Sequence, residues 1–350
     1  MENEVIILSE DPQASARMAG LRYVSDEEPG IRRKRWGRGF TYLDPQGQHI
    51  TDDRRQRFEQ LAIPPAWSDV WICPDEKGHI QATGRDAKGR KQYIYHPQWQ
   101  EIRSETKFNR LLLFGDSLPQ LRQQVDEDLR RHGMPRERVL AAVVRLLQET
   151  LIRVGNSEYM RENDSYGLTT LRMKHTEVNS RTVQFEFKGK SGKYQQVVVS
   201  DPRVARVVQQ LQELPGYELF QYVDDEGRRR TVDSDDVNEY VRQATGRDFT
   251  AKEFRTWGAT VAGVRCLREL GAPVEDANVA SMYERVAEQL GNTVAVCRQY
   301  YVHPAVVRAY KENAFFEGCD EEEEYAGREW LSEHERFTLR LLRRALSKGM

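Results

Sequence analysis

The sequence predicts an α+β protein, in which a small, antiparallel, β-rich N-terminal domain precedes a larger, mainly α-helical domain with a small β-hairpin sheet. Three observations predict this class. A length of 350 residues suffices for about two domains. Short aromatic and β-branched runs broken by turns occupy residues 40–95. From about residue 104, apolar residues recur every three or four positions, as in amphipathic helices.

The N-terminal part divides into an arm and a β-rich domain. Residues 1–30 are polar and interrupted by proline and glycine, which predicts a loosely held arm. Four strands are predicted, at residues 40–42, 70–73, 79–83 and 92–95. The second and third of them flank a glycine-bearing turn and form a hairpin, and a short helix is predicted at 54–61. The boundaries of this domain are therefore residues 1–104.

The second domain, residues 105–318, is predicted to be mainly helical. Helical periods fall at residues 121–131, 137–153, 204–211, 234–245, 252–270, 276–290 and 293–301. A hairpin interrupts them, because residues 182–187 alternate strictly, a glycine-bearing turn follows, and residues 194–199 return as a second strand. Residues 319–350 form a third segment, an acidic linker and C-terminal tail, in which residues 330–346 are amphipathic.

The composition excludes several classes of protein. Hydrophobic residues make up 39% and charged residues 31%, which is typical of a globular chain. No apolar run approaches the roughly 20 residues of a membrane-spanning helix, and the N-terminus has no secretory signal pattern. Four scattered cysteines without a Cys-x-x-Cys pair predict reduced thiols in a cytoplasmic protein, with neither a disulfide framework nor a zinc site. They are Cys73, Cys266, Cys297 and Cys319.

The overall charge conceals segregated patches. The 53 Lys and Arg residues against 55 Asp and Glu residues give a net charge of −2, whereas nucleic-acid-binding domains are usually basic. Cations nevertheless crowd residues 32–38 and 85–91, and acids gather at residues 320–324. Because the distribution matters more than the sum, the net charge does not exclude a nucleic-acid partner.

Common catalytic motifs are absent from the sequence. It contains no Gly-x-x-x-x-Gly-Lys-Ser/Thr phosphate loop, no Gly-x-Ser-x-Gly elbow and no His-Glu-x-x-His pair. The seven histidines are dispersed and make no metal-like pair at helical spacing. Neither ATP hydrolysis nor zinc catalysis is therefore predicted.

Cations and tyrosines recur instead in segments rich in glycine and small residues. The segments contain Arg153 followed by Tyr159; Lys190; Lys252 and Arg255; and Asn292 followed by Tyr300 and Tyr301. Taken singly, each has an ordinary structural explanation, as a surface cation, a solvated turn lysine, a packed aromatic side chain or a helix cap.

Together and in this order, the segments resemble those of the type IB DNA topoisomerases, in the compact branch of poxvirus and bacterial enzymes, whose catalytic fold is like that of tyrosine recombinases. The resemblance extends over about residues 40–310 and includes Ile63-Pro64-Pro65-Ala66-Trp67 and the stretch from Gly89 to Tyr95. Tyr301, directly before Val302-His303-Pro304, matches the nucleophile that attacks a DNA phosphodiester.

The resemblance also implies roles for five other residues. Arg153 and Arg255 match the arginines that hold the scissile phosphate, and Lys190 matches the lysine that protonates the leaving 5′-oxygen. Lys252 falls where the family has another basic active-site residue. Asn292 takes the position of a histidine in the poxvirus and eukaryotic enzymes; its amide can donate a hydrogen bond but carries no charge.

The chemistry of these side chains agrees with the implied reaction. Arginine forks match phosphate geometry and stay charged, and nearby cations favour the ionised form of a phenol whose ordinary pKa is about 10. A lysine can protonate the leaving alkoxide, and a phosphotyrosine linkage conserves the energy of the phosphodiester for resealing. No cofactor, ATP or metal is expected.

Tyr300 competes with Tyr301 for the role of nucleophile. On a helix the two side chains point about 100° apart, so one of them reaches the phosphate, and the family register favours Tyr301. Matching positions also imply contacts with DNA for Tyr93, Tyr95, Arg103, Tyr159, Lys188, Lys193, Arg90 and Lys91.

The resemblance implies a DNA topoisomerase that nicks one strand through a 3′-phosphotyrosyl intermediate, allows rotation and religates. It implies a cytoplasmic, nucleoid-associated monomer that clamps double-stranded DNA and has no membrane partner. Two alternatives stay open: a tyrosine site-specific recombinase and a non-enzymatic DNA-binding protein. A recombinase normally has histidine at the position of Lys252 and a helical N-terminal domain, and the complete catalytic set argues against the second. RNA as a further substrate also stays open.

Overall fold

The computed structural model describes residues 11–271, 275–316 and 329–347, and the chain forms two compact units. Unit 1 extends to Arg110 and unit 2 begins at Leu111. The boundary lies inside one long helix, α3, whose bounds are Pro97–Leu129. Helical structure is predicted from about residue 104. Helix α3 begins seven residues earlier, at Pro97, shortly after strand β5 ends at Tyr95.

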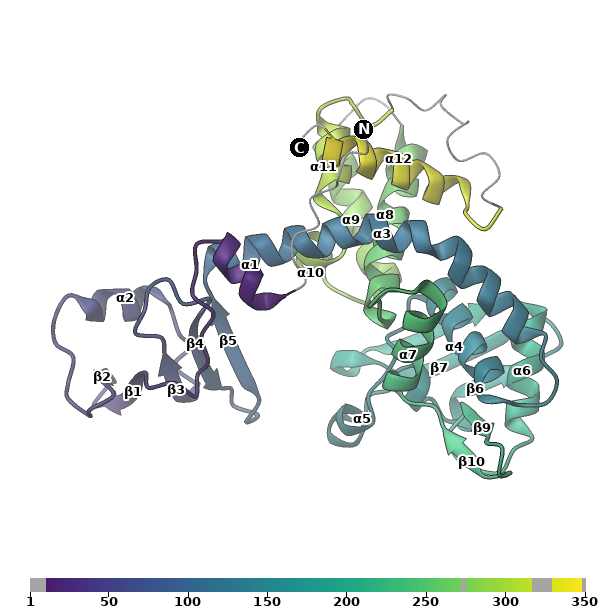
Figure 1. The fold of residues 1–350 in the computed structure, drawn as a ribbon, viewed down its shortest axis with the longest axis horizontal. Helices are drawn as coiled ribbons and strands as arrows, with labels where there is room; N and C mark the ends of the chain where they lie inside the picture. The colour runs from purple at the N-terminus through teal and green to yellow at the C-terminus, as the bar shows by residue number, and fades with distance from the viewer. Residues whose placement is uncertain (1–10, 272–274, 317–328, 348–350) are drawn as a thin grey trace. The chain divides into compact units, whose positions relative to one another are not determined.

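Unit 1 is built on an antiparallel sheet with the strand order β2-β1-β3-β4-β5 (Figure 1). The strands are β1 Ile31–Trp36, β2 Gly39–Leu43, β3 Ser68–Ile72, β4 Ile80–Arg85 and β5 Lys91–Tyr95. Helix α2, Arg54–Gln60, buries Phe58 in the core of the sheet with Tyr42, Ile72 and Ala82. The predicted hairpin, the last strand and the short helix are confirmed.

Two elements of unit 1 differ from the sequence-based expectation. Strand β1 is dominated by cations, so residue pattern does not reveal it, and it is held by antiparallel pairing with β2, in which Arg35 faces Phe40. Helix α1, Pro12–Met18, lies where a loose arm is predicted. The Asp11 side chain caps α1, and Ala16 packs with Trp99. The prediction of a loose arm is therefore wrong from residue 11 onward.

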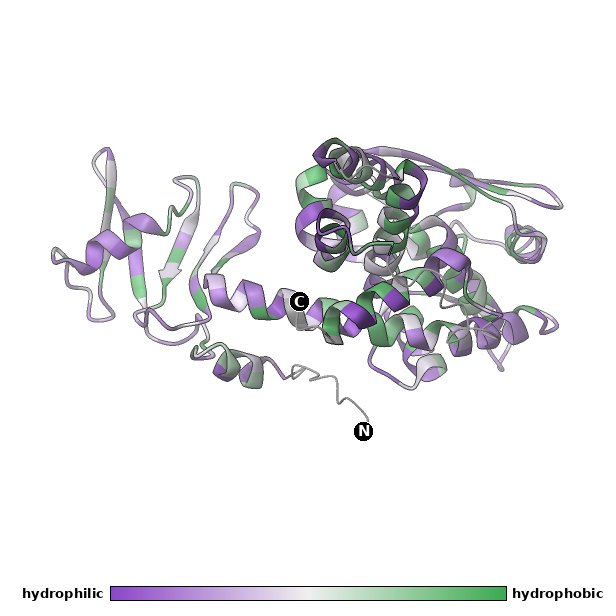
Figure 2. Cartoon of the chain, turned by 90° about the horizontal axis from the view of Figure 1, so that it is seen from above, coloured by the Kyte–Doolittle hydropathy of each residue, from purple (hydrophilic) through white to green (hydrophobic). Residues whose placement is uncertain are grey.

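Unit 2 is mainly helical and packs around one continuous core (Figure 1). Its further helices are α4 Arg136–Thr150, α5 Ser157–Asn163, α6 Pro202–Gln212, α7 Ser234–Thr245, α8 Ala251–Leu270, α9 Asp276–Leu290, α10 Val294–Tyr300, α11 Pro304–Lys311 and α12 Glu333–Ser347. Helix α4 lies at the centre of unit 2 and contacts α6, α7 and α8. Hydrophobic and hydrophilic residues mix along most helices, as amphipathic packing requires (Figure 2).

The hairpin predicted in unit 2 is confirmed as two strands of a small antiparallel sheet. Its order is β6-β7-β8, with β6 Thr176–Val178, β7 Val183–Lys188 and β8 Tyr194–Val199. A second ribbon, β9 Gln221–Val223 with β10 Arg229–Thr231, has strands too short to give a residue pattern. The acidic run 320–324 lies outside the described residues, and α12 packs on α8 and α11.

Candidate active site

Arg153 stands on an extended segment just after the central helix. Helix α4 ends at Thr150 because Leu151 turns into the left-handed region, with φ 55°. The Leu168 amide then donates to the Arg153 carbonyl at 2.9 Å. A Cβ on Gly167 would come within 2.6 Å of that carbonyl, so glycine is required for this close approach. The backbone of Arg153 is thereby fixed beside the core.

Arg255 lies on the inner side of α8 and is 5% exposed. Its guanidinium donates to the carbonyl of Leu151 and, at 3.0 Å, to the carbonyl of Leu290. Leu151 ends α4 and Leu290 is the last residue of α9, so Arg255 connects α8 with both of these helices. Burial and the nearby Arg153 lower the pKa of Arg255 from its ordinary value.

Asn292 follows the glycine that ends α9. Gly291 adopts φ 63°, and the Asn292 amide donates to the Ala287 carbonyl at 2.9 Å. The Asn292 Oδ1 accepts from Arg153 Nη2 at 2.6 Å. Within the part of the chain that the structure describes, the Nδ2 of Asn292 is buried and has no hydrogen-bond partner. The same side chain helps to lower the pKa of Tyr301, so its amide lies close to the phenol.

Tyr301 lies one residue beyond α10, with φ −124°, and not inside a helix as predicted. Its amide donates to the Cys297 carbonyl at 3.0 Å, and its carbonyl accepts from the hydroxyl of the buried Thr260 at 3.2 Å. The Arg255 guanidinium carbon lies 5.2 Å from the centre of the Tyr301 ring. Tyr300, by contrast, is 50% exposed, so the structure separates the two tyrosines.

The electrostatic surroundings favour the phenolate form of Tyr301. Burial on its own would raise the pKa of the phenol, but the positive charges of Arg255 and Arg153 outweigh burial and hold the pKa of Tyr301 below its ordinary value. Arg153, Arg255, Asn292 and Tyr301 thus form one cluster, from three segments far apart in the chain, because Asn292 and Tyr301 flank the short helix α10. We call these four residues the phosphate cluster.

The two predicted lysines lie apart from the phosphate cluster. Lys190 is exposed in the turn Lys190–Gly192 between β7 and β8, and Lys252 is exposed in the first turn of α8. No contact joins either side chain to the phosphate cluster among the described residues. The neighbouring Lys193 does reach it, because its Nζ donates to the Asn292 carbonyl at 3.4 Å.

The residues predicted to contact DNA in unit 1 lie on β5, the turn before it and the start of α3. Tyr93 and Tyr95 stack with ring centres 5.7 Å apart, and Arg103 lies over the Trp99 ring. Arg90 pairs with Asp86 at 2.7 Å, and Lys91 pairs with Asp26 at 2.7 Å. In both pairs the cation is exposed, whereas the Asp86 and Asp26 side chains are 17% and 18% exposed.

The residues predicted to contact DNA in unit 2 lie on α5 and on the hairpin. Tyr159 is part of α5, which the Asn156 side chain caps. Lys188 ends β7 and pairs with Asp164 at 3.6 Å in an exposed setting. Lys193 begins the return of the hairpin beside Asn292.

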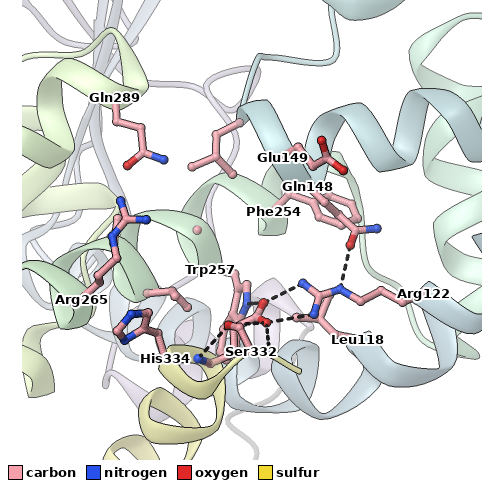
Figure 3. Close-up of a pocket in the computed structure, with 15 residues that line it drawn as sticks. Leu118, Arg122, Gln148, Glu149, Phe254, Trp257, Arg265, Gln289, Ser332 and His334 are labelled. Atoms are coloured by element: carbon pink, nitrogen blue, oxygen red, sulfur yellow. Dashed lines mark hydrogen bonds and ion pairs between the residues drawn. The ribbon is translucent and has the colours of Figure 1, made fainter. Parts of the chain in front are cut away.

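The support behind α8 is not evident from the sequence. Trp257, two residues after Arg255, donates to Glu335 of α12 at 3.1 Å, and Arg122 of α3 makes a two-pronged ion pair with the same carboxylate. Figure 3 shows Arg122, Trp257 and Ser332 around this point, at a cavity of about 310 Å³. Trp257 and Glu335 are 78 positions apart, so no local pattern could predict their contact.

Among the described residues, no helix is long and apolar enough to cross a membrane. No group of three or more His, Cys, Asp or Glu side chains that could hold a metal ion is found among the same residues.

Comparisons with known proteins agree on one family. Residues 96–321 match the model of the eukaryotic DNA topoisomerase I catalytic core, and residues 39–86 match the bacterial DNA topoisomerase IB N-terminal domain. DNA topoisomerase 1B of Acanthamoeba polyphaga mimivirus is 32% identical over 82% of this chain and 89% of its own length. DNA topoisomerase 1B of Vaccinia virus (strain Copenhagen) is 23% identical over 80% of this chain and 90% of its own length.

The likeness to solved structures is weaker than the likeness in sequence to these relatives. The crystal structure of the XerH site-specific recombinase bound to its difH substrate is 14% identical and covers 57% of this chain and 52% of its own, with a TM-score of 0.36. At that score the likeness carries no argument about function.

Proposed function

The chain belongs to the type IB DNA topoisomerases, and on this premise we propose that it relaxes supercoiled DNA through a 3′-phosphotyrosyl intermediate on Tyr301, without ATP or a metal ion. The observation that carries the proposal is the phosphate cluster, in which a partly buried tyrosine with a lowered pKa lies beside two arginines and a buried amide donor. This is the set of groups that attack on a phosphodiester requires.

In the cleavage step, the Tyr301 oxygen attacks the scissile phosphorus and the bond from phosphorus to the 5′-oxygen breaks. Negative charge builds on the non-bridging oxygens, where Arg153, Arg255 and the Nδ2 of Asn292 stabilise it. Since both arginines are held by fixed partners, little reorganisation is needed as the charge develops.

The leaving 5′-oxygen takes a proton from Lys190. An alkoxide is a poor leaving group unless it is protonated, and a lysine on a short turn can reach it as a general acid. Lys252, in the first turn of the helix that carries Arg255, provides a further positive charge. Religation reverses the step: the 5′-hydroxyl attacks the phosphotyrosine, Lys190 takes back the proton and Tyr301 is released.

We propose that the enzyme acts as a monomer on double-stranded DNA in the cytoplasm, at the nucleoid. Cys73, Cys266 and Cys297 are buried free thiols, which is typical of a reducing compartment. Each unit carries exposed cations of the predicted DNA-contacting set, such as Lys91 in unit 1 and Lys188 in unit 2, and phosphate contacts of this kind provide most of the affinity for duplex DNA.

The test is relaxation of a supercoiled plasmid by the purified full chain, in EDTA and without ATP. We expect ladders of relaxed topoisomers. Absence of relaxation across a range of salt concentrations contradicts the proposal. A recombinase needs paired specific sites, so relaxation of a plasmid that has none would also exclude that alternative.

A further inference from the structure

We propose that Gln195 is a positioning residue, which holds the turn carrying Lys190 against the turn carrying Asn292 and so places the general acid at the scissile bond. The inference rests on the proposed function, because it concerns the delivery of Lys190 in the cleavage step. Gln195 would act through Lys190 and would contact neither the Tyr301 phenol nor the scissile phosphate.

The strand register places Gln195 on the inner face of the hairpin. Residues directly opposite each other in an antiparallel pair share a face, and the pairs here are Val183 with Val199, Phe185 with Val197 and Phe187 with Gln195. The three β7 residues are buried, with exposed fractions of 2% or less. Gln195 therefore continues an apolar row with a polar side chain, at the end of β8 nearest the turn.

The Gln195 carboxamide packs between two glycines from different turns. A Cβ placed on Gly189 would lie 3.0 Å from the Gln195 Nε2, and a Cβ on Gly291 would also lie 3.0 Å from that atom. Gly189 directly precedes Lys190, and Gly291 directly precedes Asn292. The absence of a side chain on both glycines lets one amide contact the two turns at once. We call this contact the glutamine bridge.

The glutamine bridge is the close contact that sets the spacing of the two turns. Among the described residues, the hydrogen bond between them is from Lys193 Nζ to the Asn292 carbonyl, and at 3.4 Å with an exposed lysine it is long. The Lys190 turn keeps its own backbone hydrogen bonds, such as the one from the Gly189 amide to the Lys193 carbonyl at 2.7 Å. Loss of the Gln195 side chain therefore leaves this turn held to the Asn292 turn by the one long hydrogen bond. The phosphate cluster is fixed by other contacts, so charge stabilisation persists while proton delivery falls.

This separation of roles gives a selective readout. A DNA substrate with a 5′-bridging sulfur has a leaving group that needs no proton. We expect Gln195→Ala to slow single-turnover cleavage of ordinary DNA about tenfold or more, as part of the contribution of a general acid. The same variant should cleave the sulfur substrate at close to the wild-type rate. Lys190→Ala, measured in parallel, should show the same pattern with a larger defect.

A matched control is the next residue of the strand. Gln196 points to the opposite face, where its Nε2 donates to Glu186 at 2.9 Å. Gln196→Ala should therefore cleave both substrates at close to the wild-type rate. Gly189→Ala is a second test, because φ −87° suits alanine while its Cβ displaces the amide, so it should reproduce the selective defect if Gln195→Ala does not fold.

The outcomes separate this inference from the proposed function. If Lys190→Ala is rescued by the sulfur substrate but Gln195→Ala and Gly189→Ala show equal defects on both substrates, or none, the glutamine bridge is overturned and the acid role of Lys190 stands. If Lys190→Ala itself is not rescued, the acid role fails and the inference fails with it.

Discussion

At the scale of single residues, the role that we propose for Asn292 places a neutral side chain at an anionic transition state. Its Oδ1 accepts from Arg153 at 2.6 Å, which fixes the orientation of the amide and leaves Nδ2 as the donor. The charge that this position lacks would come from Arg153, which contacts Asn292, and from Arg255, which lies beside Tyr301. Histidine at the same place could add charge but could not accept from Arg153 while protonated.

The assignment of the nucleophile can be tested with neighbouring residues. Tyr301→Phe removes one oxygen and little volume, so we expect loss of relaxation and of covalent trapping with noncovalent DNA binding nearly unchanged. Tyr300→Phe is the matched control and should retain activity, since Tyr300 is half exposed and lies outside the phosphate cluster. Loss of activity in Tyr300→Phe with activity retained in Tyr301→Phe would shift the assignment by one residue.

The lowered pKa of Tyr301 gives a second residue-scale prediction. In free protein with ¹³C-labelled tyrosine, the resonance that disappears in Tyr301→Phe should titrate below the ordinary value of about 10. A cation stabilises the phenolate, so Arg153→Ala should raise that pKa and should slow cleavage about 100-fold, as removal of one transition-state donor does. A Tyr301 pKa at or above 10 that Arg153→Ala leaves unchanged would contradict the account.

The family resemblance singled out six side chains, of which the structure brings Arg153, Arg255, Asn292 and Tyr301 together, but the sequence does not show how they are held. Arg153 lies beyond the end of its helix because Leu151 has a positive φ, and no pattern marks that turn. The carbonyls that hold Arg255 come from helix ends, and backbone acceptors leave no trace in a sequence. Gln195 is not marked by the sequence, because residues 194–199 read Tyr-Gln-Gln-Val-Val-Val and only the register with β7 places it in the apolar row.

At the scale of elements, α12 is part of the support of α8. Sequence periodicity predicts the helix, but its partner depends on burial of Glu335 with Arg122 and Trp257. Similarly, the charged β1 exists because β2 and β3 pair with it, and local propensity alone does not favour it. Long periodic helices such as α7 and α9 were predicted almost to the residue, because their apolar faces carry the signal.

Loss of the Glu335 carboxylate should destabilise unit 2. Burial would raise the pKa of Glu335, but the ion pair with Arg122 outweighs it and holds the pKa at about 2. Glu335→Gln leaves Arg122 buried without a charge partner, so we expect a loss of about 3–5 kcal/mol in the free energy of unfolding by denaturant titration. The exposed Glu333, which pairs with Arg268, provides the control, because Glu333→Gln should have little effect.

The ion pair between Glu335 and Arg122 also predicts how the stability of unit 2 depends on pH. The folded-state pKa lies below the unfolded value of about 4.3, so this stabilisation is fully present above that pH and is lost as the pH falls toward 2. In Glu335→Gln that part of the acid sensitivity should be absent. An unchanged difference in stability between wild type and Glu335→Gln across this range would contradict the assignment.

At the scale of the whole molecule, the net charge of −2 is compatible with DNA binding because the cations are concentrated in patches. Affinity from phosphate contacts falls steeply with salt. We expect Arg103→Ala to reduce the slope of log affinity against log salt by about 0.9, the value of one phosphate contact. Arg54→Ala, an exposed arginine of unit 1 outside the predicted DNA-contacting set, should leave the slope unchanged.

The central claim is that one DNA strand is joined through its 3′-phosphate to Tyr301. The most direct measurement is denaturation of the cleavage reaction on duplexes labelled at either end of the scissile strand, followed by mass spectrometry of the DNA-linked peptide. For a 3′-phosphotyrosyl linkage, we expect the label on the 5′ side of the break to stay with the protein and the modified residue to be Tyr301. A protein joined to the 5′-phosphate end, or a peptide modified at Tyr300 or elsewhere, would contradict it.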